Sequence, residues 1–174
     1  MIKLLKSLLV ALLLPVCSYA AGWDDAEYKR IEQSIQQPKL SEKVYAITSY
    51  GAKTTASAAQ NQKAINRAIS LASKKGGKVV IPAGTWNTGA IELKSGVNLV
   101  IEEGATLRFA FEPKLYPLVR TSWEGLACWN YSPCIYAYQA KDIAITGKGT
   151  IDGGGNNDTW WQWNGNPRFG FKAG

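Results

Sequence analysis

From Lys78 onward, the sequence consists of short apolar runs separated at close intervals by glycine, asparagine, aspartate or proline. Each run is too short for a helix, and the frequent turn residues predict one strand per run with a corner after it. Such a chain can fold as a sandwich, a barrel or a solenoid. The runs are Val79–Ile81, Ile91–Leu93, Val97–Ile101, Thr106–Phe109, Ile135–Tyr138, Ile143–Ile145 and Thr150–Ile151.

An internal repeat favours the solenoid. Residues Ile91–Leu107 align without a gap on Ile135–Ile151, at an offset of 135 − 91 = 44 positions. We interpret this offset as two coils of about 22 residues, a size typical of stacked repeats. Alternate apolar side chains then point inward and stack from coil to coil, which predicts a parallel β-helix. The aligned pairs include Ile91 with Ile135, Asn98 with Asp142, Leu99 with Ile143, Ile101 with Ile145, and Leu107 with Ile151.

Two helices are expected before the strands. The first spans Trp23–Gln37 and ends at Pro38, with Ala26, Ile31 and Ile35 as its candidate buried positions. A strand over residues 44–49 is expected to follow it.

The second helix begins at a capping box of Ser57 and Gln60 and stops at Gly76–Gly77. A single well-marked helix followed only by strands is expected to cover one end of the solenoid as an α-helical cap. Its apolar stripe at helical spacing consists of Ala64, Ile65, Ala68, Ile69 and Ala72.

The first 20 residues are typical of an export signal. Lys3 and Lys6 precede the apolar run Leu8–Leu14, and Ser18–Ala20 supplies the small residues that a signal peptidase reads. We expect cleavage after Ala20 and a periplasmic or extracellular protein whose residues 21–174 form one β-helix domain. The run is shorter than the roughly 20 residues of a membrane span. A membrane anchor and a lipoprotein modified at Cys17 are the alternatives.

Composition narrows the chemistry. Lysine and arginine outnumber aspartate and glutamate by 20 to 13, and a basic surface suits a polyanion, which for an exported protein is an acidic polysaccharide rather than nucleic acid. Alternatively, the basic residues bind no partner and only keep the chain soluble. The sequence has no histidine, which excludes Ser-His-Asp chemistry and histidine metal sites. Cys128 and Cys134 either form a disulfide, which export permits, or remain thiols.

A series of motifs resembles the pectin-lyase-like β-helix superfamily, and the later ones resemble its bacterial polygalacturonase branch, glycoside hydrolase family 28. The resemblance covers nearly all of residues 21–163. The chain departs from the family at Ala58–Asn61, where acidic residues are usual. The motifs are Ile47–Lys53, Gly76–Trp86, Leu93–Leu99, Glu103–Leu107, Trp123–Gly125, Asn130–Pro133 and Ile143–Gly153.

The resemblance implies an all-β, right-handed parallel β-helix, of which this chain supplies the first few coils with an N-terminal α-helical cap. It implies metal-free and cofactor-free hydrolysis of galacturonan-type bonds in pectin or rhamnogalacturonan, with inversion, by a protein that is monomeric at full length. The family uses aspartates in Asn-x-Asp and Asp-Asp segments, with Gly-His-Gly and Arg-x-Lys segments completing the site. One carboxylic acid protonates the leaving oxygen while the others activate water, about 6.5–9.5 Å away.

None of these segments can be placed in the sequence, so no catalytic residue is assigned. Asn156–Asp158 imitates Asn-x-Asp and Asp24–Asp25 imitates the aspartate pair, but the first reads as a turn and the second as the start of a helix. We expect the catalytic segments to lie beyond Gly174. Residues 21–174 alone are therefore expected to be inactive, and to aggregate through an uncovered last coil.

Four residues are candidate sugar contacts: Trp160, Trp161, Trp163 and Arg120. Tryptophan faces stack on sugar rings and arginine pairs with uronate carboxylates. As alternatives, the tryptophans pack over a coil edge and Arg120 pairs with Glu124. Two other functions stay open, a non-catalytic β-helix module that binds glycans or acts as a spike, and a calcium-dependent polysaccharide lyase. The absence of an Asp/Glu cluster disfavours the lyase.

Overall fold

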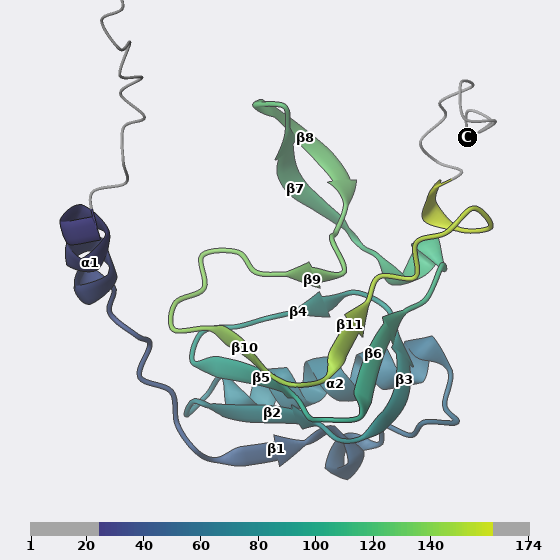
Figure 1. Ribbon diagram of the computed structural model, residues 1–174. Coiled ribbons are helices and arrows are strands. Elements are labelled where there is room, and N and C mark those ends of the chain that lie inside the picture. Colours follow the sequence, from purple (N-terminus) through teal and green to yellow (C-terminus); the bar gives the residue numbers. More distant parts are fainter. Residues whose placement is uncertain (1–24, 162–174) are drawn as a thin grey trace, which may run out of the picture. The chain divides into compact units, whose positions relative to one another are not determined.

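The computed structural model describes residues 25–161 (Figure 1). The chain divides into two compact units, residues 1–37 and residues 38–174. The expected export signal lies outside the described residues. None of the helices within residues 25–161 is long and apolar enough to cross a membrane.

In the first unit the structure describes one helix, α1 (Asp25–Ser34). This helix ends at Ser34, three residues before Gln37, where the sequence predicted its end. The prediction that Ala26, Ile31 and Ile35 are buried is wrong, because all three are exposed. No residue of α1 is buried, since the described part of this unit contains no second element for an apolar stripe to pack against.

The second unit begins with a short strand, β1 (Val44–Ala46), followed by a 3-10 helix, η1 (Ile47–Tyr50). The predicted strand over residues 44–49 is thus correct only for its first half. Ile47 is fully buried, and the chain then turns at Gly51, whose φ of 99° suits glycine. The tight turn shortens the strand.

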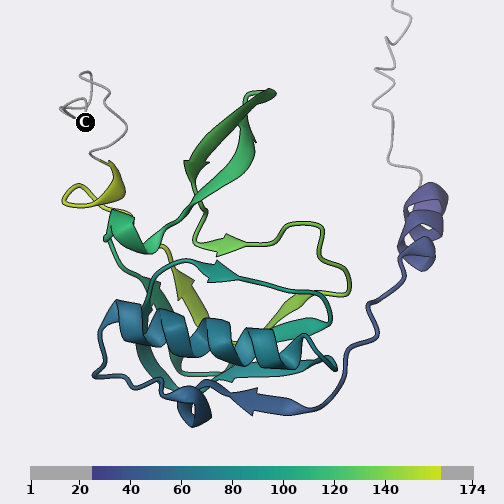
Figure 2. The same cartoon turned by 180° about the vertical axis from the view of Figure 1, so that it is seen from behind.

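The helix α2 (Ala58–Ala72) follows the prediction closely. The Ser57 side chain accepts a hydrogen bond from the Gln60 N–H, and the Gln60 side chain accepts one from the Ser57 N–H. The five residues of the predicted apolar stripe are all buried. Through them α2 packs against β1 to β4, and Figure 2 shows the helix lying along one side of the coils.

The remaining strands form three parallel sheets and one antiparallel hairpin (Figure 1). The parallel sheets have the orders β1-β2-β5-β10, β3-β6-β11 and β4-β9, and the chain visits them in turn, which makes a parallel β-helix. The parallel strands are β2 (Gly77–Ile81), β3 (Gly84–Thr88), β4 (Ile91–Glu92), β5 (Val97–Ile101), β6 (Ala105–Phe109), β9 (Ile135–Tyr136), β10 (Ala144–Gly147) and β11 (Thr150–Asp152).

The hairpin interrupts the second coil. After β6 come a 3-10 helix, η2 (Pro113–Leu115), and then β7 (Leu118–Trp123) and β8 (Leu126–Tyr131), which project away from the stack (Figure 1). The two residues between the strands, Glu124 and Gly125, both have positive φ, 48° and 85°. Paired positive φ values are the signature of a two-residue type I′ turn. Neither strand was predicted from the sequence.

The coils differ in length, so the prediction of two equal coils of about 22 residues is wrong. From the first coil to the second, Val79 pairs with Leu99, a step of 99 − 79 = 20 residues. From the second to the third, Leu99 pairs with Ile145, a step of 145 − 99 = 46 residues. The long repeat in the sequence is therefore one coil enlarged by the hairpin, which adds residues without adding a rung to the stack.

The register of the predicted repeat is confirmed at its two ends and wrong in its middle. Ile91 pairs with Ile135, as predicted. Leu99, however, pairs with Ile145 and not with Ile143. The slip is two residues, and because strand side chains alternate with period two, the predicted inward and outward faces stay correct.

Gly147 and Gly149 explain how the slip is reversed before β11. Between the paired positions Ile101 and Thr106 the second coil has four residues, whereas the third coil has two between Gly147 and Thr150. Gly147 has a φ of 109°, and a Cβ there would lie 1.9 Å from the Ile101 carbonyl oxygen. Only glycine fits this shortened corner.

The core lies inside the coils and under α2. Inward side chains stack in columns from rung to rung, so that Trp86 lies on Leu107 and Thr88 on Phe109. At the third coil the columns reach Ile145 and Ile151, which are 45% and 44% exposed. The third coil therefore presents a partly uncovered apolar surface.

Candidate functional site

The outer face of the sheet β3-β6-β11 carries two ladders of polar side chains. Because side chains alternate along each strand, residues in register on parallel strands stack on one face. The first ladder consists of Thr85, Thr106 and Thr150, and the second consists of Asn87, Arg108 and Asp152.

An ion pair organises the second ladder. Arg108 Nε donates to Asp152 Oδ2 at 2.8 Å, and Asp152 Oδ1 accepts the Gly154 N–H at 2.9 Å. The Gly154 N–H, and then Arg108, hold the pKa of the Asp152 carboxyl below its ordinary value. Asp152 is therefore an ionised hydrogen-bond acceptor at neutral pH and unsuited to donate a proton.

The second ladder forms one side of an open groove of about 410 Å³. Within residues 25–161, Asp152 is the one carboxylate among the groove's lining residues. The other side comes from the end of β6 and the turn after β11, and the residues of these two segments that line it are Phe109, Ala110, Phe111, Gly154, Gly155, Asn156 and Thr159.

The turn after β11 is held by its own side chains. Asn156 Oδ1 accepts the Asp158 N–H at 2.8 Å, and Thr159 Oγ1 donates to the Gly154 carbonyl at 2.6 Å. Asp158 itself is exposed and does not line the groove. The segment 156–158 is thus a turn, as its composition indicates. The pair Asp24–Asp25, which resembles the family's Asp-Asp segment, is also non-catalytic in position, because Asp25 lies in the first turn of α1. Asp24 lies outside the described residues.

The candidate tryptophans have different environments. The Trp160 ring lies edge-on to Phe111, with centroids 4.8 Å apart, and edge-on to Tyr116 at 5.1 Å, so it packs beside the groove wall. Trp161 is 52% exposed. Trp163 lies outside the described residues. The structure therefore places Trp160 in a packing role and leaves the Trp161 ring open to solvent.

Arg120 is not among the lining residues of the groove. It lies on β7, exposed and opposite Trp129 on β8. The ion pairs found among the described residues do not include Arg120, so the alternative of a pair with Glu124 is not formed.

Both described cysteines are free thiols. Cys128 lies on β8 of the hairpin, whereas Cys134 packs against the two hydrophobic clusters of the second unit. Burial raises the pKa of the Cys134 thiol above its ordinary value.

Sequence reasoning missed the Asn87–Arg108–Asp152 ladder. The sequence did contain a signal that Arg108 and Asp152 are neighbours, because they are separated by 152 − 108 = 44 positions, which is the offset of the internal repeat. Only the alternation within each strand was needed to place both side chains on the outer face.

The groove can bind and orient a polar ligand. Hydrolysis with inversion requires two carboxyl groups, one of them protonated. The described part of the groove offers one, and it is ionised. Residues 25–161 also contain no group of three or more His, Cys, Asp or Glu side chains placed to hold a metal ion.

The fold and the groove define a parallel β-helix protein with a polar groove along one sheet, and the comparisons narrow this class. No family model matches the chain. It is 32% identical over 112 residues to a probable polygalacturonase of Vitis vinifera, over 59% of this chain and 22% of that protein. It is 35% identical over 124 residues to an exo-poly-alpha-D-galacturonosidase of Dickeya chrysanthemi, over 65% of this chain and 20% of that protein.

Two solved structures that resemble this chain are also polygalacturonases. A hyperthermoactive exopolygalacturonase from Thermotoga maritima superimposes with a TM-score of 0.77 at 33% identity, over 86% of this chain and 34% of that one. A family 28 exopolygalacturonase from Yersinia enterocolitica superimposes with a TM-score of 0.57 at 31% identity, over 65% of this chain and 21% of that one. The homologues of this chain are therefore polygalacturonases of family 28, as the motifs indicated. The chain spans about a fifth of the length of the two curated relatives.

Proposed function

We propose that this chain belongs to an exported glycoside hydrolase that cleaves galacturonan-type bonds in pectin, and that its groove holds part of the polysaccharide. The homology to exopolygalacturonases across the described coils carries this proposal. The apolar run and small residues of the first 20 positions support export.

The groove suits an acidic sugar. Arg108 uses Nε for Asp152, which leaves its two terminal nitrogens to donate to a uronate carboxylate. Asp152 accepts hydrogen bonds from sugar hydroxyls, and the Asn87 amide both donates and accepts. The ladder repeats at the spacing of neighbouring strands, about 4.8 Å, so a bound saccharide meets polar groups from several coils at once.

The catalytic carboxyl groups are proposed to come from other coils of the same solenoid. Inversion needs a protonated carboxyl and a carboxylate about 6.5–9.5 Å apart. Strands two rungs apart in a stacked sheet are separated by roughly 9.4–9.8 Å, which is close to the upper end of this range. In this arrangement α2 closes the first coil, because its apolar stripe is buried against β1 to β4.

Activity of the complete encoded protein tests the proposal. We expect it to release reducing ends from polygalacturonate, while residues 21–174 alone release none. In the complete protein, Arg108→Gln should raise KM at least about tenfold with a smaller effect on kcat, because the lost contact is to bound substrate. Lys148→Gln, which removes an exposed charge outside the groove, should change neither. A complete protein that binds polygalacturonate without cleaving it would instead be a glycan-binding module.

A further inference from the structure

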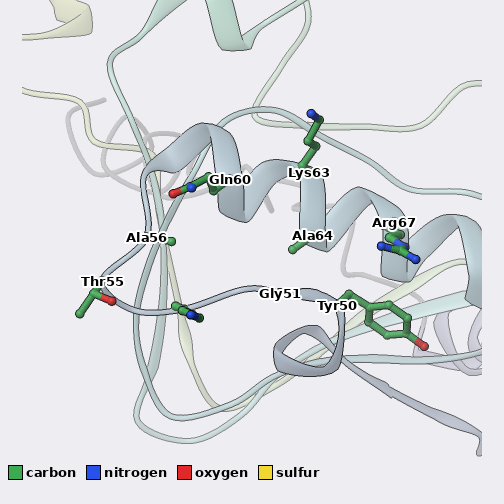
Figure 3. A pocket seen from close by; sticks show the side chains of 9 residues that line it. Tyr50, Gly51, Thr55, Ala56, Gln60, Lys63, Ala64 and Arg67 are labelled. Atoms are coloured by element: carbon green, nitrogen blue, oxygen red, sulfur yellow. The ribbon is translucent and has the colours of Figure 1, made fainter.

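A second hollow lies on another part of the unit, between η1 and α2 (Figure 3). It has a volume of about 520 Å³, and one of its sides is formed by Tyr50 at the end of η1. Lys63 and Arg67 on α2 form another side, and Lys53 and Thr55 come from the loop between the two helices. The hollow shares no lining residue with the groove.

This hollow is strongly basic. Lys53, Lys63 and Arg67 line it, and no Asp or Glu of the described chain does. None of the three cations takes part in an ion pair found among residues 25–161. Other surface cations of the chain do form ion pairs, for example Arg108 with Asp152.

The arrangement of these charges costs stability. Lys63 and Arg67 are four residues apart on α2, which places them on the same side of the helix, and like charges at this spacing repel. Lys53 adds a third positive charge at the same hollow. An anionic ligand would remove this repulsion, so the cluster has the electrostatics of an anion site.

An aromatic ring adds a second element of recognition. Tyr50 is half-buried, and its ring is held in a stacked arrangement with Tyr45, with centroids 6.5 Å apart and an interplanar angle of 25°. Tyrosine offers an apolar face and a polar hydroxyl to a ligand. A ring face beside cations matches a sugar ring that bears a carboxylate, whereas a simple inorganic anion makes no use of the ring.

We propose that this hollow binds one uronate unit of an acidic saccharide. Arg67 and Lys63 receive the carboxylate, and the sugar ring packs against Tyr50. The ligand class is the one given by the proposed function, but the residues differ, so the site is a separate point of attachment of the chain to its polysaccharide.

Binding of a trisaccharide tests this site. Residues 21–174 carrying Arg108→Gln, which removes the groove's proposed uronate contact, are attached sparsely to a biosensor surface. Molecules cannot associate with one another there, and trigalacturonate is passed over them in low salt. Lys63→Gln/Arg67→Gln should weaken the binding at least about tenfold, since each charge-assisted contact contributes more than a neutral one. Glutamine is as good a helix former as lysine or arginine, and far-ultraviolet circular dichroism should show an unchanged fold.

The matched control is Lys94→Gln/Lys148→Gln, which removes the same charge from elsewhere on the surface and should leave binding unchanged. Methyl-esterified trigalacturonate should bind at least about tenfold more weakly, and Tyr50→Leu should weaken trigalacturonate but not inorganic phosphate. The proposal is overturned if the control loses as much affinity as the α2 variant, or if phosphate competes as well as trigalacturonate. Arg108→Gln separates the two sites, because it should raise the KM of the complete protein without removing the affinity that depends on Lys63 and Arg67.

Discussion

At the residue scale, one buried amide joins the helix to the coils. Asn61 is fully buried, and its Oδ1 accepts the Lys53 N–H at 3.0 Å. Its Nδ2 donates to the carbonyls of Lys53 and Asn87, both at 3.0 Å. A buried amide with all of these partners fixes the loop before α2 and the strand β3 to the same point.

Replacing this amide should be costly. Asn61→Ala removes three part-buried hydrogen bonds, to the Lys53 N–H and to the carbonyls of Lys53 and Asn87, so we expect a loss of about 2–4 kcal/mol in the free energy of unfolding. Urea unfolding at low protein concentration measures it. Asn130→Ala, an exposed position on β8, should change stability by less than about 0.5 kcal/mol. Equal effects at the two positions would mean that Asn61 is not buried.

The two thiols should react at different rates. Cys134 has a raised pKa and is packed against apolar side chains, so less of it is thiolate, and reagents reach it slowly. In residues 21–174 at pH 8, iodoacetamide should modify Cys128 at least about ten times faster than Cys134, as measured by peptide mass spectrometry. A disulfide-linked peptide containing both, or equal rates, would contradict the structure.

At the element scale, local sequence patterns predicted what local forces determine. The cap of α2, its buried stripe and most parallel strands follow from spacing and turn residues. The hairpin β7–β8 was not predicted because its strands bury few side chains and therefore show no one-sided apolar pattern. The only local signal for it was the Glu124–Gly125 turn. The prediction that α1 has a buried apolar stripe was wrong for a different reason. A sequence pattern shows which side chains share a helix face, but not whether another element packs against that face.

The hairpin should be dispensable for the stack. Pro117 and Ser132 lie at its base, and the Ser132 N–H donates to the Pro117 carbonyl at 2.8 Å, so the two ends already meet. Replacing residues 118–131 by two glycines should therefore change the free energy of unfolding by less than about 1 kcal/mol. Urea unfolding compares the two chains. Loss of the cooperative transition would show that the hairpin is part of the core.

At the scale of the whole molecule, the sequence repeat correctly indicated a solenoid but not the number of its coils. An offset between similar segments does not reveal how much of the intervening chain leaves the stack. The polar groove depends on the same long-range stacking, because β3, β6 and β11 bring Asn87, Arg108 and Asp152 together only when the coils are in register. Its location could therefore not be read from any one segment.

The uncovered face of the third coil should control solubility. Ile145 and Ile151 continue buried columns yet are nearly half exposed, and among the strands of residues 25–161, β10 and β11 lie at sheet edges. Residues 21–174 should self-associate, and Ile145→Lys/Ile151→Lys should shift them towards monomer in sedimentation velocity. Trp123→Lys/Leu126→Lys, at the exposed hairpin tip, is the control and should have the smaller effect. If the hairpin variant is the more soluble one, association occurs through the hairpin instead.

The register between the second and third coils is the claim on which the solenoid and its groove both depend. Val100 and Thr146 pair across β5 and β10 with side chains on the outer face. In a chain with Cys128→Ser and Cys134→Ala, the pair Val100→Cys/Thr146→Cys should form a disulfide on mild oxidation, detected as a linked peptide, because paired strand positions meet the distance requirement. The pair Val100→Cys/Ala144→Cys, at the 44-residue offset, should not. Preferential linkage of that second pair, or of neither, would contradict the stacked coils described for this protein.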